Sequence, residues 1–159
     1  MGSTVIFDSA ARPALGRRVT QSSLREFASI LEKRVAKGRA FDCLITGDAE
    51  LRRLNKQFLR KSYPADVLSF PGPAKGAPTV KVRSAVPLGE LAISADRALS
   101  QAREHNHPLA DELKILMLHG VLHLIGLDHE TDHGEMALAE TRWRKAFALP
   151  NGLIERSAQ

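Results

Sequence analysis

All six histidines of this 159-residue chain lie between residues 105 and 133, and two of them interrupt its most apolar stretch, 115–127. That stretch is shorter than the roughly 18 apolar residues of a membrane-spanning helix, so we expect a buried helix in a soluble domain. His119 and His123 are four residues apart, which places both rings on one face of such a helix. Buried without a shared partner, their polar groups would cost about 1–3 kcal/mol each.

A third histidine completes a pattern typical of a metal site. Gly126 can take the left-handed conformation that ends a helix, so the chain can turn and bring His129 to the same ion. Three neutral imidazoles leave a fourth position open, as in catalytic zinc sites. We predict that His119, His123 and His129 bind one zinc ion per chain. Asp128, beside His129, either orients a ligand ring or caps a helix end.

The three remaining histidines and the single cysteine are expected in opposite environments. His105, His107 and His133 are expected at the surface. Cys43 has no second cysteine to pair with and lies in an apolar-rich run, so we expect it to be buried. A free cysteine and the lack of a secretory signal pattern at the N-terminus favour the cytoplasm.

The composition, 43% hydrophobic and 26% charged, excludes a disordered tail, a collagen-like repeat and a disulfide-stapled miniprotein. The length suits a single domain over residues 1–159. Hydrophobic patterning predicts four strands, over residues 4–8, 41–46, 66–70 and 88–93. Capping residues predict about five helices, which begin near Ser23 (with Glu26), Asp48, Ser94, Pro108 and Asp132. The expected fold is α/β (α+β): a mixed sheet packed against helices, with the metal site in the C-terminal helical half.

The chain is basic, with 23 Lys+Arg against 18 Asp+Glu and a net charge of +5, which favours a polyanionic partner. Five of these cations lie in the segment 51–61, which has no acidic residue: Arg52, Arg53, Lys56, Arg60 and Lys61. Such a run usually forms a solvated helix face, but beside a metal site it can neutralise phosphate oxygens. We therefore expect Arg53, Lys56 and Lys61 to contact the substrate.

Four blocks of sequence resemble the YbeY family of bacterial rRNA maturation factors, and they follow the same order along the chain as in that family. The run 119–129, His-Gly-Val-Leu-His-Leu-Ile-Gly-Leu-Asp-His, looks like the family's signature. The blocks 54–60, 66–71 and 88–94 are similar to its central part, and the similarity extends from about Thr4 to Ile154.

The resemblance implies a zinc-dependent endoribonuclease that acts on single-stranded RNA in small-subunit (16S) rRNA maturation and ribosome quality control. It implies that His119, His123 and His129 hold the zinc, and that Arg60 is the catalytic cation facing it. The expected partners are the small-subunit rRNA precursor and the ribosome or one of its small-subunit proteins. No membrane or DNA partner is expected.

Two alternatives stay open. The histidine spacing also matches metzincin proteases, but these need Glu after the first histidine as the general base, and this chain has Gly120 there. A peptidase would have to recruit another base, such as Glu130 or Glu135, so a zinc hydrolase of another substrate is one alternative. The other is a non-catalytic ribosome-assembly factor in which the zinc is structural.

Overall fold

The computed structural model describes residues 2–58, 65–73, 86–128 and 130–157. These residues form four strands: β1 (Thr4–Phe7), β2 (Phe41–Thr46), β3 (Val67–Pro71) and β4 (Gly89–Ser94). They also form seven helices: α1 (Arg12–Leu15), α2 (Gln21–Arg34), α3 (Asp48–Phe58), α4 (Ala95–Glu104), α5 (Leu109–Leu124), α6 (Glu135–Ala146) and α7 (Leu153–Ser157). The strands make one mixed sheet in the order β1-β2-β4-β3, with β3 antiparallel to β4 and the other pairs parallel. The predicted α/β class is confirmed.

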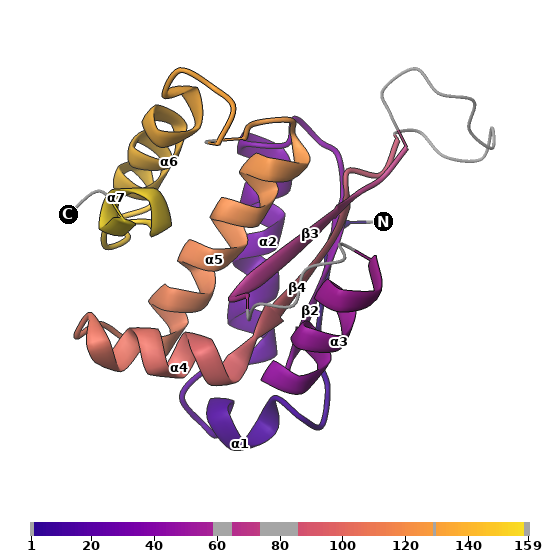
Figure 1. The fold of residues 1–159 in the computed structure, drawn as a ribbon, viewed down its shortest axis with the longest axis vertical. Coiled ribbons are helices and arrows are strands. Elements are labelled where there is room, and N and C mark those ends of the chain that lie inside the picture. Colours follow the sequence, from indigo (N-terminus) through magenta and orange to yellow (C-terminus); the bar gives the residue numbers. More distant parts are fainter. Residues whose placement is uncertain (1, 59–64, 74–85, 129, 158–159) are drawn as a thin grey trace.

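Helices cover both faces of the sheet (Figure 1): α2 and α5 pack on one face and α3 on the other. The alternation of side chains along a strand explains the two layers. Leu91 and Ile93 of β4 belong to the main core, whereas Ala92 between them packs with Leu51 of α3 and Leu68 of β3. The sheet therefore separates anything carried by α3 from anything carried by α5.

Helix α5 is buried on most of its surface, because it packs against β3, β4, α2, α4 and α6. Gly120 allows its close approach to the sheet: a Cβ there would lie 2.6 Å from Leu91 Cδ2 and 3.3 Å from Val67 Cγ2. This contact fixes the rotation of the helix about its axis and hence the direction of its histidines. Although α5 is apolar, none of the described helices has the length and apolar character needed to cross a membrane.

The structure corrects two details of the expected helices. The helix expected to begin near Ser23 begins at Gln21, and its N-cap is Thr20, whose hydroxyl accepts a hydrogen bond from the Ser23 amide at 3.2 Å. The two short helices α1 and α7 add to the five expected ones, since segments of four and five residues carry too little periodicity to be predicted. The N-cap at Ser94 is confirmed, with its hydroxyl 3.2 Å from the Arg97 amide.

Candidate metal centre

His119 and His123 lie one turn apart in the second half of α5, with their ring centroids 4.8 Å apart and their planes at 75°. His119 is buried, with 7% of its surface exposed, while His123 is partly exposed. The pair therefore lies at the boundary between core and solvent. One ring is held within the protein and the other is partly exposed to solvent.

A buried carboxylate fixes the orientation of the first ring. Glu140 of α6 is 1% exposed, and its Oε2 lies 2.8 Å from His119 Nδ1. Where Glu140 is ionised it only accepts hydrogen bonds, which would place the proton on Nδ1 and the lone pair of His119 on Nε2, directed away from Glu140. A carboxylate behind a histidine in this way is typical of zinc ligands. The two described imidazoles are of the donor type that zinc prefers.

The end of α5 turns the chain back, as the sequence predicts. Gly126 has φ of +105°, and its amide donates to His123 O at 3.0 Å. The Leu127 amide donates to Leu122 O at 3.1 Å, which completes a Schellman motif. Asp128 follows directly, and its carboxylate accepts from the Glu130 amide at 3.0 Å. This hydrogen bond ties the Asp128 side chain to the backbone of Glu130, while its predicted role toward a ligand ring stays a prediction.

Three predicted site residues, His129, Arg60 and Lys61, lie outside the described residues. Within the described ranges, no three side chains of the metal-binding types come together. The structure therefore brings together two of the three expected ligands and adds Glu140 behind the first of them.

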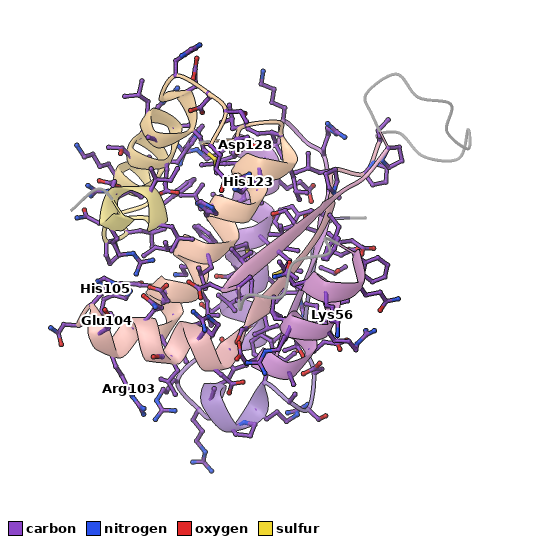
Figure 2. The ribbon with its side chains drawn as sticks, viewed as in Figure 1. Lys56, Arg103, Glu104, His105, His123 and Asp128 are labelled. Carbon is purple, nitrogen blue, oxygen red and sulfur yellow. The ribbon has the colours of Figure 1, made fainter. Side chains whose placement is uncertain are left out.

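The three described cations of the basic run, Arg52, Arg53 and Lys56, lie on α3, which packs on the sheet face opposite α5. Figure 2 shows Lys56 far from His123 and Asp128, which lie together at one end of α5. Arg53 donates to both carboxylate oxygens of Glu50, at 2.5 and 2.9 Å, and these hydrogen bonds lower the pKa of Glu50. Arg52 also pairs with Asp48 at 3.3 Å. The acidic residues just before the basic run therefore offset part of its charge. Substrate contacts by Arg53 and Lys56 remain predictions.

Position 120 is the one at which a metzincin-like peptidase would carry its general base. In this chain that position packs against Leu91 and Val67 of the sheet, and Ser69 donates to Gly120 O at 3.2 Å. No side chain at position 120 would reach the histidine pair without displacing the sheet. The helix packing therefore argues against this route to peptide hydrolysis.

Comparison with known proteins identifies the family. The family model described as "Endoribonuclease YbeY" matches residues 14–147. The chain belongs to the YbeY family.

Individual YbeY relatives match over most of their length. A protein of Solibacter usitatus named Endoribonuclease YbeY is 54% identical, over 98% of this chain and 95% of its own. Proteins of the same name from Koribacter versatilis and Helicobacter pylori are 42% and 37% identical, and the alignments cover 89% and 84% of this chain and 86% and 87% of theirs. A solution structure of a Thermotoga maritima protein has the same fold, with a TM-score of 0.52 at 24% identity over 88% of this chain and 85% of that one.

Sequence reasoning missed Glu140 and misjudged His107. Glu140 lies four residues after Met136 on the apolar face of α6, and this position was the available signal, since a carboxylate on a core-facing stripe needs a partner.

His105 and His133 are exposed, as expected. His107 is not: its side chain is 8% exposed, and its Nε2 lies 2.6 Å from the fully buried Glu112. The expectation of a surface position failed because Glu112, five residues later, supplies a buried acceptor.

Proposed function

We propose that this YbeY-family chain is a zinc-dependent endoribonuclease that cleaves single-stranded regions of small-subunit (16S) rRNA precursors in the cytoplasm. The observation that carries the proposal is the pair His119 and His123, one turn apart, with Glu140 holding the first ring from behind. Relatives named as endoribonucleases align with this chain over nearly its whole length. We expect the enzyme to act in ribosome maturation and quality control together with the ribosome or a small-subunit ribosomal protein.

The proposed ligands are His119, His123 and His129, and Asp128 is the residue proposed to orient a ligand ring. Zinc held by three imidazoles supplies a Lewis acid and lowers the pKa of a bound water toward about 7. The chain's own contribution is to fix the ligand rings. Glu140 lies against Nδ1 of His119, and Gly126, three residues before His129 in the sequence, takes the left-handed conformation that ends the helix.

Arg60 is the proposed catalytic cation. A phosphodiester gains negative charge on its non-bridging oxygens as it is cleaved, and a guanidinium presents a planar, permanently charged pair of donors to them. Arg53, Lys56 and Lys61 would then neutralise neighbouring phosphates. The exposed pairing of Arg53 with Glu50 is no obstacle, because exposed ion pairs are worth only about 0–1 kcal/mol and exchange readily for a phosphate.

Two substitutions separate this function from the alternatives. Arg60→Ala should lower the rate of RNA cleavage by about 100-fold or more while leaving zinc content and folding unchanged. A wild-type cleavage rate in Arg60→Ala would show that the mechanism is wrong. If peptides rather than RNA are cleaved, and the rate does not depend on Arg60, the chain is a zinc hydrolase of another kind.

His123→Ala tests whether the zinc is structural. A catalytic zinc should be lost while the chain stays folded, since the sheet and α5 are packed independently of the ligands. If His123→Ala unfolds the chain, as judged by circular dichroism, while wild-type protein cleaves no RNA, the assembly-factor alternative is correct.

A further inference from the structure

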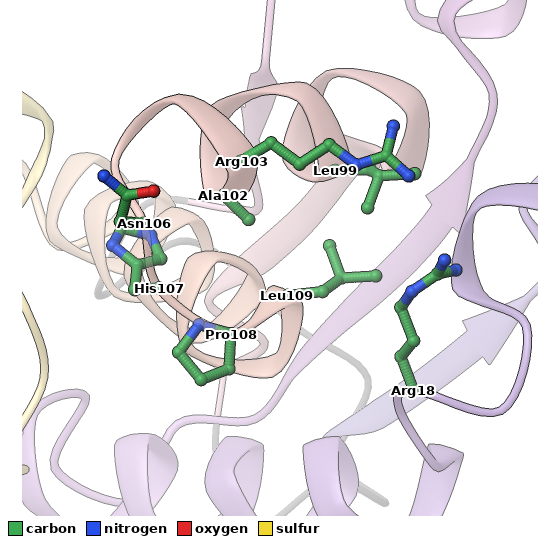
Figure 3. Close-up of a pocket in the computed structure, with 8 residues that line it drawn as sticks. All are labelled: Arg18, Leu99, Ala102, Arg103, Asn106, His107, Pro108 and Leu109. Carbon is green, nitrogen blue, oxygen red and sulfur yellow. The ribbon is translucent and has the colours of Figure 1, made fainter.

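A hollow of about 570 Å³ lies where α1, α4 and the start of α5 meet, and we call it the α1–α4 hollow (Figure 3). It is separate from the metal centre. Its border includes Leu109, and His123 lies 14 residues further along α5, which corresponds to about 21 Å along the helix. Figure 2 shows the same separation, with Arg103 and His105 at the end of α4 and His123 at the far end of α5.

The hollow has a cationic lining. Arg18 and Arg103 both line it, and none of the described lining residues is acidic. Arg18 donates a hydrogen bond to Ala14 O at 3.1 Å. The side chain of Arg103 makes no hydrogen bond or ion pair within the described part of the chain. In Figure 3 the two side chains come from different elements and extend toward the same side of the hollow. Such a pair of guanidinium groups suits an anion with several acceptor oxygens.

One wall of the hollow is rigid. His107 lines it, and its Nε2 lies 2.6 Å from Glu112 Oε1. Glu112 is fully buried and also accepts from Arg156 Nη1 at 3.0 Å and Nη2 at 3.1 Å. This network holds the ring in place before any ligand arrives. A preformed wall lowers the entropy cost of binding.

The floor of the hollow is apolar. Leu99 and Ala102 of α4 and Leu109 of α5 line it, and Asn106 adds an amide at its edge. An apolar floor beside two cations suits a ligand that alternates charge with uncharged groups. A nucleic-acid strand has this character, since each phosphate is flanked by a ribose and a base.

We propose that the α1–α4 hollow binds the phosphate backbone of the RNA substrate, about 21 Å from the metal centre. The inference rests on the proposed function, because an RNA substrate supplies the polyanion that would occupy both sites. At the roughly 3.4 Å spacing of a stacked strand, a span of about 21 Å corresponds to about six nucleotides. A tetranucleotide that occupies the metal centre therefore falls short of the hollow, whereas a 20-nucleotide RNA reaches it.

The test is the affinity of the zinc-loaded protein for fluorescein-labelled RNAs of 4 and 20 nucleotides, measured by anisotropy. The double variant Arg18→Ala/Arg103→Ala should bind the 20-nucleotide RNA about tenfold more weakly at 0.1 M salt. The slope of log affinity against log salt should become less steep by about 1.4, since two phosphate contacts are lost from a single strand. Binding of the tetranucleotide should not change. Arg103→Glu alone provides a second variant, because the Arg103 side chain has no contact that the fold requires.

The matched control is Arg25→Ala/Lys33→Ala, which removes the same charge from exposed positions of α2. Equal losses in both double variants would mean that only net charge matters and would overturn the proposal. Equal weakening of the tetranucleotide would also overturn it, because the residues would then act on the metal centre. A variant that loses affinity for poly-glutamate but not for RNA would show that the hollow binds an acidic peptide instead. If the wild type binds the long RNA but cleaves none, the proposed function fails while the binding comparison still decides the proposal.

Discussion

Glu140 serves two parts of the molecule at once. Its Oε2 accepts from His119 Nδ1 at 2.8 Å, and its Oε1 accepts from the Ile154 amide at 2.9 Å. A buried carboxylate is costly unless such donors surround it, and here the donors are the proposed metal ligand and the start of α7. The orientation of the ring at the metal centre is therefore coupled to the packing of the C-terminal helix.

Replacing Glu140 by Gln should weaken zinc binding. Either His119 Nδ1 or the Ile154 amide would then face the NH₂ group of the glutamine, which cannot accept a hydrogen bond. In the first case the proton of His119 would no longer be held on Nδ1, and in the second the Ile154 amide would lose its acceptor. We expect about a 10- to 100-fold loss of zinc affinity in competition with a chromophoric chelator. Glu104→Gln, at an exposed position of α4, is the control. Equal zinc affinity in Glu140→Gln and wild type would contradict this role.

Cys43 should be chemically inert in the folded chain. It is 1% exposed in the middle of β2, and burial raises the pKa of its thiol to about 12. At pH 8 only about one thiol in ten thousand would be ionised, and a thiol reagent in solution has no access to the buried sulfur. We expect no reaction with a disulfide reagent in native protein and rapid reaction in urea. Fast labelling of the native protein would show that β2 is accessible.

At the scale of single residues, the sequence predicts which residues of one segment lie together better than it predicts their contacts with other helices. His119, His123 and Gly126 are defined by spacing within one helix, so periodicity is enough to relate them. Glu140 is 21 residues from His119, and the contact depends on how α6 packs against α5. The burial of His107 likewise depends on the corner between α4 and α5, which no local pattern specifies.

At the scale of elements, α7 is held to the rest of the molecule by ion pairs as well as by the packing of Leu153 and Ile154 on the core. Arg156 donates two hydrogen bonds to the buried Glu112 of α5, and Arg144 of α6 donates two to Glu155, both at 2.8 Å. A helix of five residues cannot be stable alone, so these contacts determine its position.

Removal of Arg156 should destabilise the chain measurably. Arg156→Ala leaves the buried Glu112 with His107 as its remaining described partner, and breaking a buried pair from one side costs about 3 kcal/mol. We expect that loss in urea unfolding, against a negligible change for the exposed control Arg25→Ala. Adding Glu112→Gln should recover part of it, because the unpaired charge is then gone. A double variant less stable than Arg156→Ala would be inconsistent with this explanation.

The pair Arg144–Glu155 should make the docking of α7 sensitive to acid. Hydrogen bonds from Arg144 lower the pKa of Glu155, so the pair contributes stability above the ordinary glutamate pKa. That contribution is lost as the pH falls through the lowered pKa. Glu155→Gln should therefore be less stable than wild type at pH 7, by about 0.5–1 kcal/mol, and the difference should shrink as the pH falls below the ordinary glutamate pKa. A difference that does not change with pH would have to come from another cause.

The elements themselves were largely predictable. Strand β2 follows the expected range 41–46, and the other three strands differ by one residue at their ends, because alternation within a strand is a local property. The prediction that Ser23 caps α2 was wrong. Thr20 and Ser23 both fit an N-cap, and only the packing of the helix decides between them. The sheet order β1-β2-β4-β3 depends on long-range pairing and lies beyond local patterns.

At the scale of the whole molecule, the groups proposed to bind or cleave RNA lie in three regions. The histidine pair is at one end of α5, the α1–α4 hollow is near the other end, and α3 carries Arg53 and Lys56 on the opposite face of the sheet. An RNA that contacts all three regions would have to pass around the sheet. This arrangement favours a long, single-stranded substrate over a compact small molecule.

The most direct test of this account is the rate of RNA cleavage as zinc is removed and restored. Tag-free protein purified without added metal should contain about one zinc per chain by elemental analysis. Cleavage of a single-stranded RNA should stop when a chelator removes that zinc and return when one equivalent is added back. Cleavage at an unchanged rate by fully metal-free protein would show that RNA cleavage does not depend on zinc.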